Sequence, residues 1–249
     1  MNKTKNIIIT GGHGRIGSAL TEFLISNGHN VLVSDIKPAK NKTIFKNGNY
    51  NFIKLDLTKE KNIKKLIKFG KKKFKIIDGL IHLSYPKSKN WGVDLSILKQ
   101  TDLNQGLINN LGATIILSKN ILKTFQQQKK GNLILFSSIY GVFTPRFSDY
   151  PKGKIYSPAE YAVMKSGTIS FVKYLAKKYQ KKGIRINCIS PGGIKDGQNT
   201  KFIKNYEKNC NSKGLLDAAD LNGLVKFLIS EDSLYINGQN IIIDDGWSL

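Results

Sequence analysis

The alternation of short apolar runs with longer amphipathic segments constrains the fold of this 249-residue chain more than any other feature. The apolar runs are rich in β-branched residues, as strands buried on both faces require. They cover residues 6–10, 31–35, 51–56, 76–83, 132–137, 185–189 and 240–244. Strands that alternate with helices over this length predict an α/β Rossmann fold, a doubly wound parallel sheet of seven strands with helices on both faces.

Between the strands, apolar residues at three- and four-residue steps predict helices at about 16–28, 60–69, 102–128, 161–182 and 218–229. In the third helix the buried side is expected to consist of Ile108, Leu111, Ile115, Ile116 and Leu122. No internal repeat, low-complexity linker or composition break occurs along the chain. Residues 1–249 are therefore predicted to form a single domain.

The formal net charge of +23 raises nucleic-acid binding as an alternative. However, the positive charge is almost all lysine, whereas base and phosphate readers depend on the fork of arginine. The lysines are spread along the chain, with the densest run at residues 61–75. A solvated lysine face on the helix predicted at 60–69 explains this run better, so no nucleic-acid partner is expected.

Membrane, secretion and metal signals are absent from the sequence. No apolar run reaches the ~18 residues of a membrane span, and the run at residues 7–9 is too short for a signal peptide. Cys188 and Cys210 have neither disulfide-framework nor metal-ligand spacing. These features predict a cytoplasmic protein with no metal site and no membrane partner.

A glycine-rich turn, Thr10-Gly-Gly-His-Gly-Arg-Ile-Gly17, joins the first predicted strand to the first predicted helix. Gly11, Gly14 and Gly17 would allow the tight turn, the approach of a pyrophosphate and close packing of helix on strand. The free N–H groups at the start of the helix, where Arg15 and Ile16 stand, would bind phosphates. This arrangement predicts a dinucleotide-binding site.

Asp35, at the end of the second predicted strand, is placed to accept hydrogen bonds from an adenosine ribose. A carboxylate there repels a 2′-phosphate, so NAD(H) is favoured as cofactor. Lys37 and Lys40 are near enough to keep NADP(H) possible. A simpler interpretation is that Asp35 only caps a turn.

Tyr161 and Lys165 lie one turn apart on the same face of the helix predicted at 161–182. A free phenol has a pKa near ~10, and a nearby ammonium favours the phenolate and lowers that pKa. The pair therefore suits proton transfer at neutral pH. The same spacing also occurs by chance, so it needs support from the rest of the chain.

These motifs together resemble the short-chain dehydrogenase/reductase family over essentially the whole chain. The family's catalytic serine matches Ser138 in Ser138-Ile-Tyr-Gly141, and its helix asparagine matches Asn110. The resemblance implies that Tyr161 transfers a proton to or from the substrate oxygen, that Lys165 lowers the pKa of Tyr161 and that Ser138 hydrogen-bonds the reacting oxygen. Asn110 would hold a water that links Lys165 to solvent.

The resemblance also extends the expected cofactor site beyond the glycine turn. Asp56 matches the position that contacts adenine, and Ile194 in Pro191-Gly-Gly-Ile194 matches the position whose backbone meets the nicotinamide carboxamide. Residues 1–140 would mainly bind the dinucleotide, and residues 141–249 would carry the catalytic helix and the substrate loops. The expected cofactor-binding residues are Gly11, Gly14, Arg15, Ile16, Gly17, Asp35, Asp56, Leu57, Tyr161, Lys165, Pro191, Gly192 and Ile194.

Three segments depart from the family pattern. Arg15 stands where the short branch has a glycine, and His82-Leu-Ser-Tyr-Pro86 replaces its Asn-Asn-Ala-Gly motif. We take His82 as a structural histidine rather than a catalytic base. The loop at 142–157 is longer than usual and is expected to shape the substrate pocket. Residues there and in the stretch after Ile194 that could neutralise a phosphate or stack on a ring are Arg146, Tyr150, Lys152, Lys154, Tyr156, Lys201 and Lys204.

The segments Ser157-Pro-Ala-Glu-Tyr161 and Asp244-Asp-Gly-Trp-Ser-Leu249 resemble one subgroup, the oxidoreductases of the flagellin modification protein A type. That resemblance implies a small-molecule substrate, a sugar or amino sugar that is phosphorylated or nucleotide-linked, in bacterial surface-glycan or flagellin-glycan biosynthesis. It also implies a homodimer or homotetramer. The alternatives are a reductase of 3-oxoacyl thioesters or other small carbonyls, and a dinucleotide-binding protein without turnover.

Overall fold

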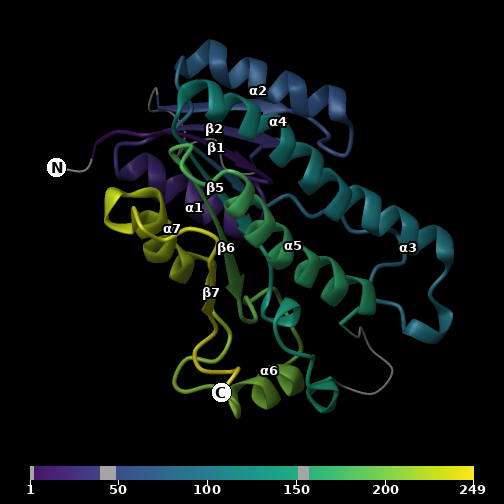
Figure 1. Cartoon of the computed structure of the whole chain (residues 1–249). Helices are drawn as coiled ribbons and strands as arrows, with labels where there is room; N and C mark the ends of the chain where they lie inside the picture. The colour runs from purple at the N-terminus through teal and green to yellow at the C-terminus, as the bar shows by residue number, and fades with distance from the viewer. Residues whose placement is uncertain (1–2, 40–48, 151–156) are drawn as a thin grey trace.

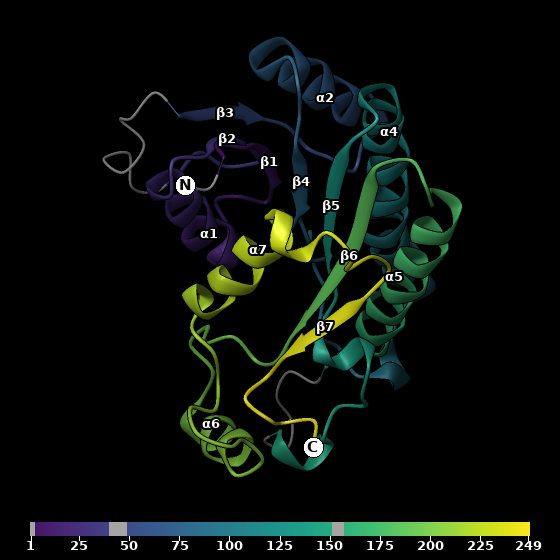
Figure 2. The ribbon, with the colours of Figure 1, turned by 60° about the vertical axis from the view of Figure 1, so that its left-hand side comes forward.

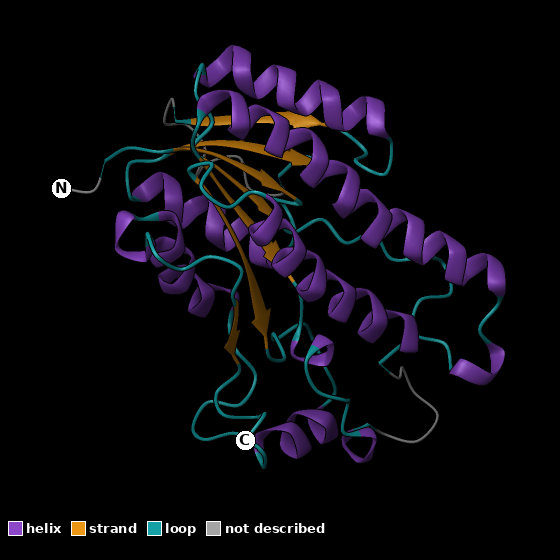
Figure 3. Ribbon diagram, viewed as in Figure 1, coloured by secondary structure: helices purple, strands orange, loops and turns teal. Residues whose placement is uncertain are grey.

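One parallel sheet organises the molecule (Figure 3). The computed structural model describes residues 3–39, 49–150 and 157–249. Within these residues the sheet has seven strands in the order β3-β2-β1-β4-β5-β6-β7. The strands are β1 (Asn6–Thr10), β2 (Asn30–Asp35), β3 (Tyr50–Lys54), β4 (Gly79–His82), β5 (Gly131–Phe136), β6 (Ile184–Pro191) and β7 (Asn240–Ile243). The predicted doubly wound α/β fold is confirmed.

Helices cover both faces of the sheet (Figures 1 and 2). Because successive strand residues point to opposite faces, Ile8 of β1 packs under α2 (Glu60–Phe74), α4 (Ala113–Gln128) and α5 (Ala159–Lys178). Ile7 and Ile9 pack under α1 (Arg15–Ser26) and α7 (Asn222–Ile229) on the other face. The central strands are therefore covered by helices on both faces, which explains their continuous apolar sequences.

The helix predicted at 102–128 is interrupted by a π turn. It consists of α3 (Gln100–Leu107), the π turn Ile108–Gly112 and α4. A π turn adds a residue to the helical repeat and so rotates the faces before and after it. The prediction that Ile108 and Ile115 are buried was wrong for this reason, since their side chains are 65% and 40% exposed.

The start of β4 and the content of the stretch after β6 also differ from the prediction. β4 begins at Gly79 instead of Ile76, because Lys75 adopts a φ of 60° and turns the chain just before it. The polar stretch after β6 contains α6 (Thr200–Glu207), whose N-cap Asn199 accepts a hydrogen bond from the Phe202 N–H. None of the described helices combines the length and the apolar character needed to cross a bilayer.

The carboxyl ends of the strands meet at one edge of the sheet. β1 lies between β2 and β4, so the chain leaves β1 toward one side of the sheet and returns through β4 to the other. In doubly wound folds ligands bind beside the strand ends at such a switch point. The residues that follow β1, β4, β5 and β6, namely Gly11, Leu83, Ser137 and Gly192, begin the loops of this edge.

Candidate active site

The glycine turn after β1 is packed so closely that side chains would collide with its own backbone and with the chain after β4. A Cβ on Gly17 would lie 2.2 Å from the Gly11 carbonyl oxygen, and Gly11 itself has a φ of +68°. Gly14 is the N-cap of α1 and makes no side-chain cap. The first N–H groups of α1, from Arg15 onward, are therefore open to an anion. This cradle fits a pyrophosphate.

Asp35 ends β2 next to this turn. Its carboxylate accepts hydrogen bonds from the backbone N–H groups of His13 (3.0 Å) and Lys37 (3.1 Å). Asp35 thus caps a turn, as the simpler interpretation held, but it remains partly exposed and retains lone pairs for further donors. The placement fits the ribose end of a dinucleotide. Lys40 lies outside the described residues.

His13 is a residue of this site that sequence reasoning missed. Its Nδ1 lies 2.7 Å from the Lys37 carbonyl oxygen and its Nε2 lies 2.8 Å from the Tyr50 hydroxyl. Its ring packs against Phe52, with the centroids 4.8 Å apart. Burial, followed by the charge of Asp35, raises the pKa of Tyr50 to about 12. His13 occupies a variable position of the glycine turn, so no local pattern marked it.

The remaining expected cofactor residues surround the same edge. The Asp56 carboxylate accepts hydrogen bonds from the N–H and hydroxyl of Thr58, and the Leu57 side chain is buried in the core. Arg15 reaches across the edge to form an ion pair with Asp196.

The turn after β6 lies at the same edge of the sheet. A Cβ on Gly192, the residue after Pro191, would lie 2.8 Å from the Cβ of Asp244. Ile194 pairs in parallel with Leu216, and its carbonyl oxygen accepts a hydrogen bond from the Gln198 amide. Close packing against the chain end therefore fixes the path of this turn.

The structure brings Ser138, Tyr161 and Lys165 together at the end of β5. Ser138 accepts a hydrogen bond from the Tyr140 N–H, and the Ser137 hydroxyl donates to the Lys165 carbonyl oxygen at 2.7 Å. A Cβ on Gly141 would lie 2.7 Å from the Lys165 carbonyl carbon. The glycine therefore lets the turn after β5 press against the first turns of α5.

Burial shifts the pKa values of Tyr161 and Lys165. Burial raises the pKa of Tyr161, while a hydrogen bond with Ser138 opposes that shift. Burial lowers the pKa of Lys165 to about 8, and its ammonium donates a 2.8 Å hydrogen bond to the Phe136 carbonyl oxygen. The Lys165 Nζ lies 5.5 Å from the Tyr161 ring centre. Whether Lys165 lowers the pKa of Tyr161 stays a prediction.

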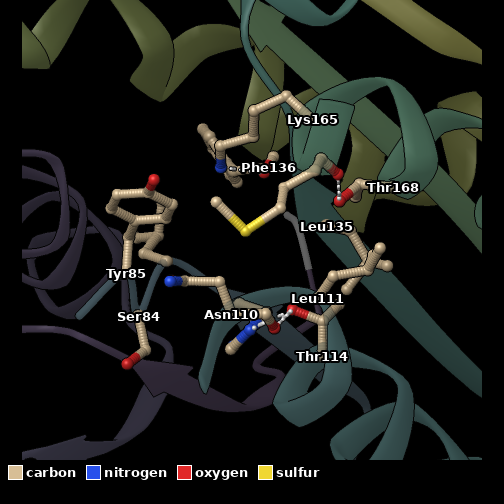
Figure 4. A pocket seen from close by; sticks show the side chains of 12 residues that line it. Ser84, Tyr85, Asn110, Leu111, Thr114, Leu135, Phe136, Lys165 and Thr168 are labelled. Carbon is tan, nitrogen blue, oxygen red and sulfur yellow. Dashed lines mark hydrogen bonds between the residues drawn. The ribbon is translucent and has the colours of Figure 1, made fainter. Parts of the chain in front are cut away.

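Asn110 sits in the π turn and lines a small cavity that Lys165 and Tyr85 also line (Figure 4). Its amide nitrogen donates to the carbonyl oxygens of Gly106 (3.0 Å) and Pro86 (3.1 Å). Its buried Oδ1 has no hydrogen-bond partner among the described residues. Because an unpartnered buried acceptor is costly, this oxygen and the cavity fit a water or a ligand hydroxyl.

An aromatic wall, Tyr85 with Trp91, is a second feature that sequence reasoning missed. Both rings meet Tyr161 edge-on, with centroids 5.3 Å and 6.4 Å away, and the Trp91 indole donates to the Tyr85 hydroxyl at 3.2 Å. The ring centre of Tyr85 also lies 5.0 Å from the Lys165 Nζ. The only signal was that the His82–Pro86 segment departs from the family pattern.

The long loop after Ser138 is tied to the chain end. Arg146 donates to the Trp247 carbonyl oxygen and to Asn209, and its guanidinium lies 5.1 Å from the Trp247 ring centre. Tyr150 donates to the Tyr140 hydroxyl and packs on Phe202. Arg146 and Tyr150 are therefore engaged within the protein, Lys201 and Lys204 are exposed, and Lys152, Lys154 and Tyr156 lie outside the described residues.

Known proteins are similar to this chain over almost its whole length. The family model described as enoyl-(acyl carrier protein) reductase matches residues 13–248. Post-translational flagellin modification protein A of Campylobacter coli is 35% identical over 257 residues, covering all of both chains. The 3-oxoacyl-[acyl-carrier-protein] reductase FabG of Buchnera aphidicola is 30% identical, covering 99% of this chain and 98% of its own.

Solved structures give the same result. A short-chain dehydrogenase of Leptospira borgpetersenii with bound NAD+ has a TM-score of 0.91 and 34% identity, covering 100% of this chain and 94% of its own. ElxO with NADP bound has a TM-score of 0.82 and 28% identity, covering 99% of each chain. The glycine cradle, Asp35 and Lys165 fit a nicotinamide dinucleotide. The chain belongs to the short-chain dehydrogenase/reductase family of NAD(P)-dependent oxidoreductases.

Proposed function

We propose that this enzyme oxidises an alcohol or reduces a carbonyl of a sugar or amino sugar, phosphorylated or nucleotide-linked, in bacterial surface-glycan or flagellin-glycan biosynthesis. The observation that carries the proposal is the end-to-end similarity to the Campylobacter flagellin modification protein. The aromatic wall of Tyr85 and Trp91 beside Tyr161 supports it, because aromatic faces suit a ring-shaped substrate with a polar rim.

The catalytic roles that we propose for four side chains are those that the family resemblance implies, and the positions of these side chains support them. Tyr161 exchanges a proton with the substrate oxygen, and Ser138, which shares a hydrogen bond with Tyr161, holds that oxygen as charge develops. A bound nicotinamide supplies or accepts the hydride. Lys165 carries the positive charge that favours the phenolate, and the unpartnered Oδ1 of Asn110 accepts from the water that connects Lys165 to solvent.

The cofactor preference that we propose is NAD(H). The Asp35 carboxylate stands beside the glycine turn, where it attracts ribose hydroxyls and repels a 2′-phosphate. The dinucleotide would be held by the glycine turn with Arg15 and Ile16, by Asp35, Asp56 and Leu57, and by Pro191, Gly192, Ile194, Tyr161 and Lys165. In this proposal residues 1–140 mainly bind the dinucleotide, and residues 141–249 carry the catalytic helix with Tyr161 and Lys165 and the substrate loops.

A homodimer or homotetramer in the cytoplasm is also proposed. Large apolar side chains are exposed on the outer surfaces of the long helices, namely Ile108, Ile115, Val163 and Tyr174. A second copy of the chain would bury them. Sedimentation of the wild type and of a Val163→Glu variant tests this, because a charge in the contact should shift the mass toward the monomer.

The substrate class is tested with a panel that separates the two leading possibilities. We expect NAD+-dependent oxidation, or NADH-dependent reduction, of nucleotide-linked or phosphorylated amino sugars. The alternative, a 3-oxoacyl thioester reductase, is favoured by the similarity to the Buchnera reductase. Turnover of a 3-oxoacyl thioester at a higher kcat/KM than any sugar would contradict the sugar proposal.

A further inference from the structure

His82 bridges two hydroxyl groups that belong to different parts of the site. It is the last residue of β4, it is buried, and it stands beside Thr10 of β1 in the sheet register. Its Nδ1 lies 2.6 Å from the Thr10 hydroxyl, and its Nε2 lies 3.0 Å from the Thr114 hydroxyl. Thr10 precedes the glycine turn, and Thr114 is on α4 just after the π turn that holds Asn110.

The hydrogen bonds fix the tautomer of the ring. The Thr114 hydroxyl donates its one proton to the Asn110 carbonyl oxygen, at 2.8 Å. It must therefore accept from His82, which places the ring proton on Nε2. Nδ1 is then an acceptor for the Thr10 hydroxyl. One continuous chain of donors results, from Thr10 through His82 and Thr114 to the backbone of Asn110.

The surroundings keep the ring uncharged. The side chain contacts Thr10 of β1 and Thr114 of α4, and the charged group that acts on it is the Lys165 ammonium of α5. Burial, followed by the charge of Lys165, lowers the pKa of His82 to about 3. A neutral ring with both nitrogens engaged can neither donate a second proton nor accept one from substrate.

We propose that His82 is a positioning residue, which locks the π turn of Asn110 to the end of β1 through the Thr10–His82–Thr114 chain. The Asn110 carbonyl oxygen accepts from the Ala113 N–H within the turn, and the Thr114 hydroxyl adds a second, side-chain hydrogen bond to the same oxygen. The link sets where the Asn110 amide stands relative to Lys165 and to the glycine turn. The catalytic consequence rests on the proposed role of Asn110.

The kinetic test uses Thr114→Val, which removes the hydroxyl with little change of shape. Displacing Asn110 should lower kcat about tenfold or more and leave the NADH Kd unchanged. The matched control is Thr124→Val, a buried threonine further along α4. His82→Leu should lower kcat as Thr114→Val does, and His82→Gln, which keeps a donor and an acceptor, should recover most of it. Equal kcat values for Thr114→Val and Thr124→Val would overturn the proposal.

A second test does not require turnover. The chain has three histidines, so nitrogen-15 NMR can assign each ring through single substitutions. We expect His82 to show the Nε2–H tautomer and no titration between about pH 5 and about pH 9. An Nδ1–H ring, or a ring that titrates in this range, would contradict the proposal even if the enzyme turned over neither a sugar nor a thioester. Absence of all turnover would count only against the proposed function.

Discussion

The glycine turn at residues 10–17 and the aromatic end, by which we mean Tyr140, Arg146, Tyr206 and Trp247, are held by different kinds of contact. In the turn, backbone groups pack closely together, and there is no room for a side chain at Gly17. At the aromatic end, side chains fill the space: Trp247 stacks on Tyr206, meets Tyr140 edge-on and is covered by Arg146. We propose that the first region binds the pyrophosphate of the cofactor, whereas the second shapes the substrate side.

Because the two regions depend on different contacts, we infer that proteins of this fold can keep their cofactor while their substrate changes. The turn depends on eight consecutive residues, but Arg146 and Trp247 are 101 residues apart in the sequence. We therefore expect that a substitution at the aromatic end can reshape the proposed substrate side while the turn stays intact. In this proposal Tyr161 and Lys165 contact both cofactor and substrate.

The largest effect is expected at the aromatic end. Trp247→Ala should lower the free energy of unfolding by about 3–5 kcal/mol, because it empties a buried site between Tyr206 and Tyr140. Urea unfolding measures the change, and Tyr235→Ala, at a side chain that is 96% exposed, is the control with an expected change near zero. A loss of NADH affinity in folded Trp247→Ala protein would show that the two regions are not independent.

The next largest effect is expected at Tyr161. Tyr161→Phe should cut turnover at least ~100-fold while NADH binding remains, since the substitution removes only the hydroxyl that exchanges the proton. Tyr174→Phe, at an exposed position of the same helix, is the matched control. Turnover of Tyr161→Phe close to that of the control would rule out Tyr161 as the proton donor.

Gly17→Ala tests the backbone character of the turn. Its Cβ would lie 2.2 Å from the Gly11 oxygen, so we expect NADH binding to weaken about tenfold, ~1.4 kcal/mol. At Gly14 the corresponding contact is 3.2 Å and a small shift would relieve it, so Gly14→Ala should be milder. Calorimetric titration compares the two variants. The account of the turn would be wrong if Gly14→Ala bound NADH more weakly than Gly17→Ala.

The smallest effect is a shift of pH dependence. Burial lowers the pKa of Lys165 to about 8, so the ammonium is present below that pH and turnover should fall as pH rises through it. The Tyr85 ring lies 5.0 Å from the Lys165 Nζ and stabilises the charged form. Tyr85→Leu should lower the pKa further and move the alkaline limb of the kcat profile down by about 0.7 pH unit, for ~1 kcal/mol of cation–π energy. An unchanged limb would contradict this.

The sequence predicted what local patterns determine. The seven strands follow from β-branched runs, and the helix predicted at 161–182 corresponds to α5, which begins two residues earlier, at Ala159. The order of strand, glycine turn and helix in the sequence predicted where the open N–H groups of α1 lie.

Features that depend on distant contacts were not predicted. The exposure of Ile108 follows from a π turn, which has no simple sequence pattern. The engagement of Arg146 and Tyr150 depends on Trp247 and Phe202, which come much later in the chain. His13 and Trp91 acquire their places only when β3 and α5 are assembled beside them.

Titration of the purified wild-type protein with NADH and with NADPH tests the central claim most directly. We expect NADH to bind and NADPH to bind at least ~10-fold more weakly, because Asp35 repels the 2′-phosphate at the glycine turn. Tighter binding of NADPH, or no binding of either dinucleotide, would contradict it.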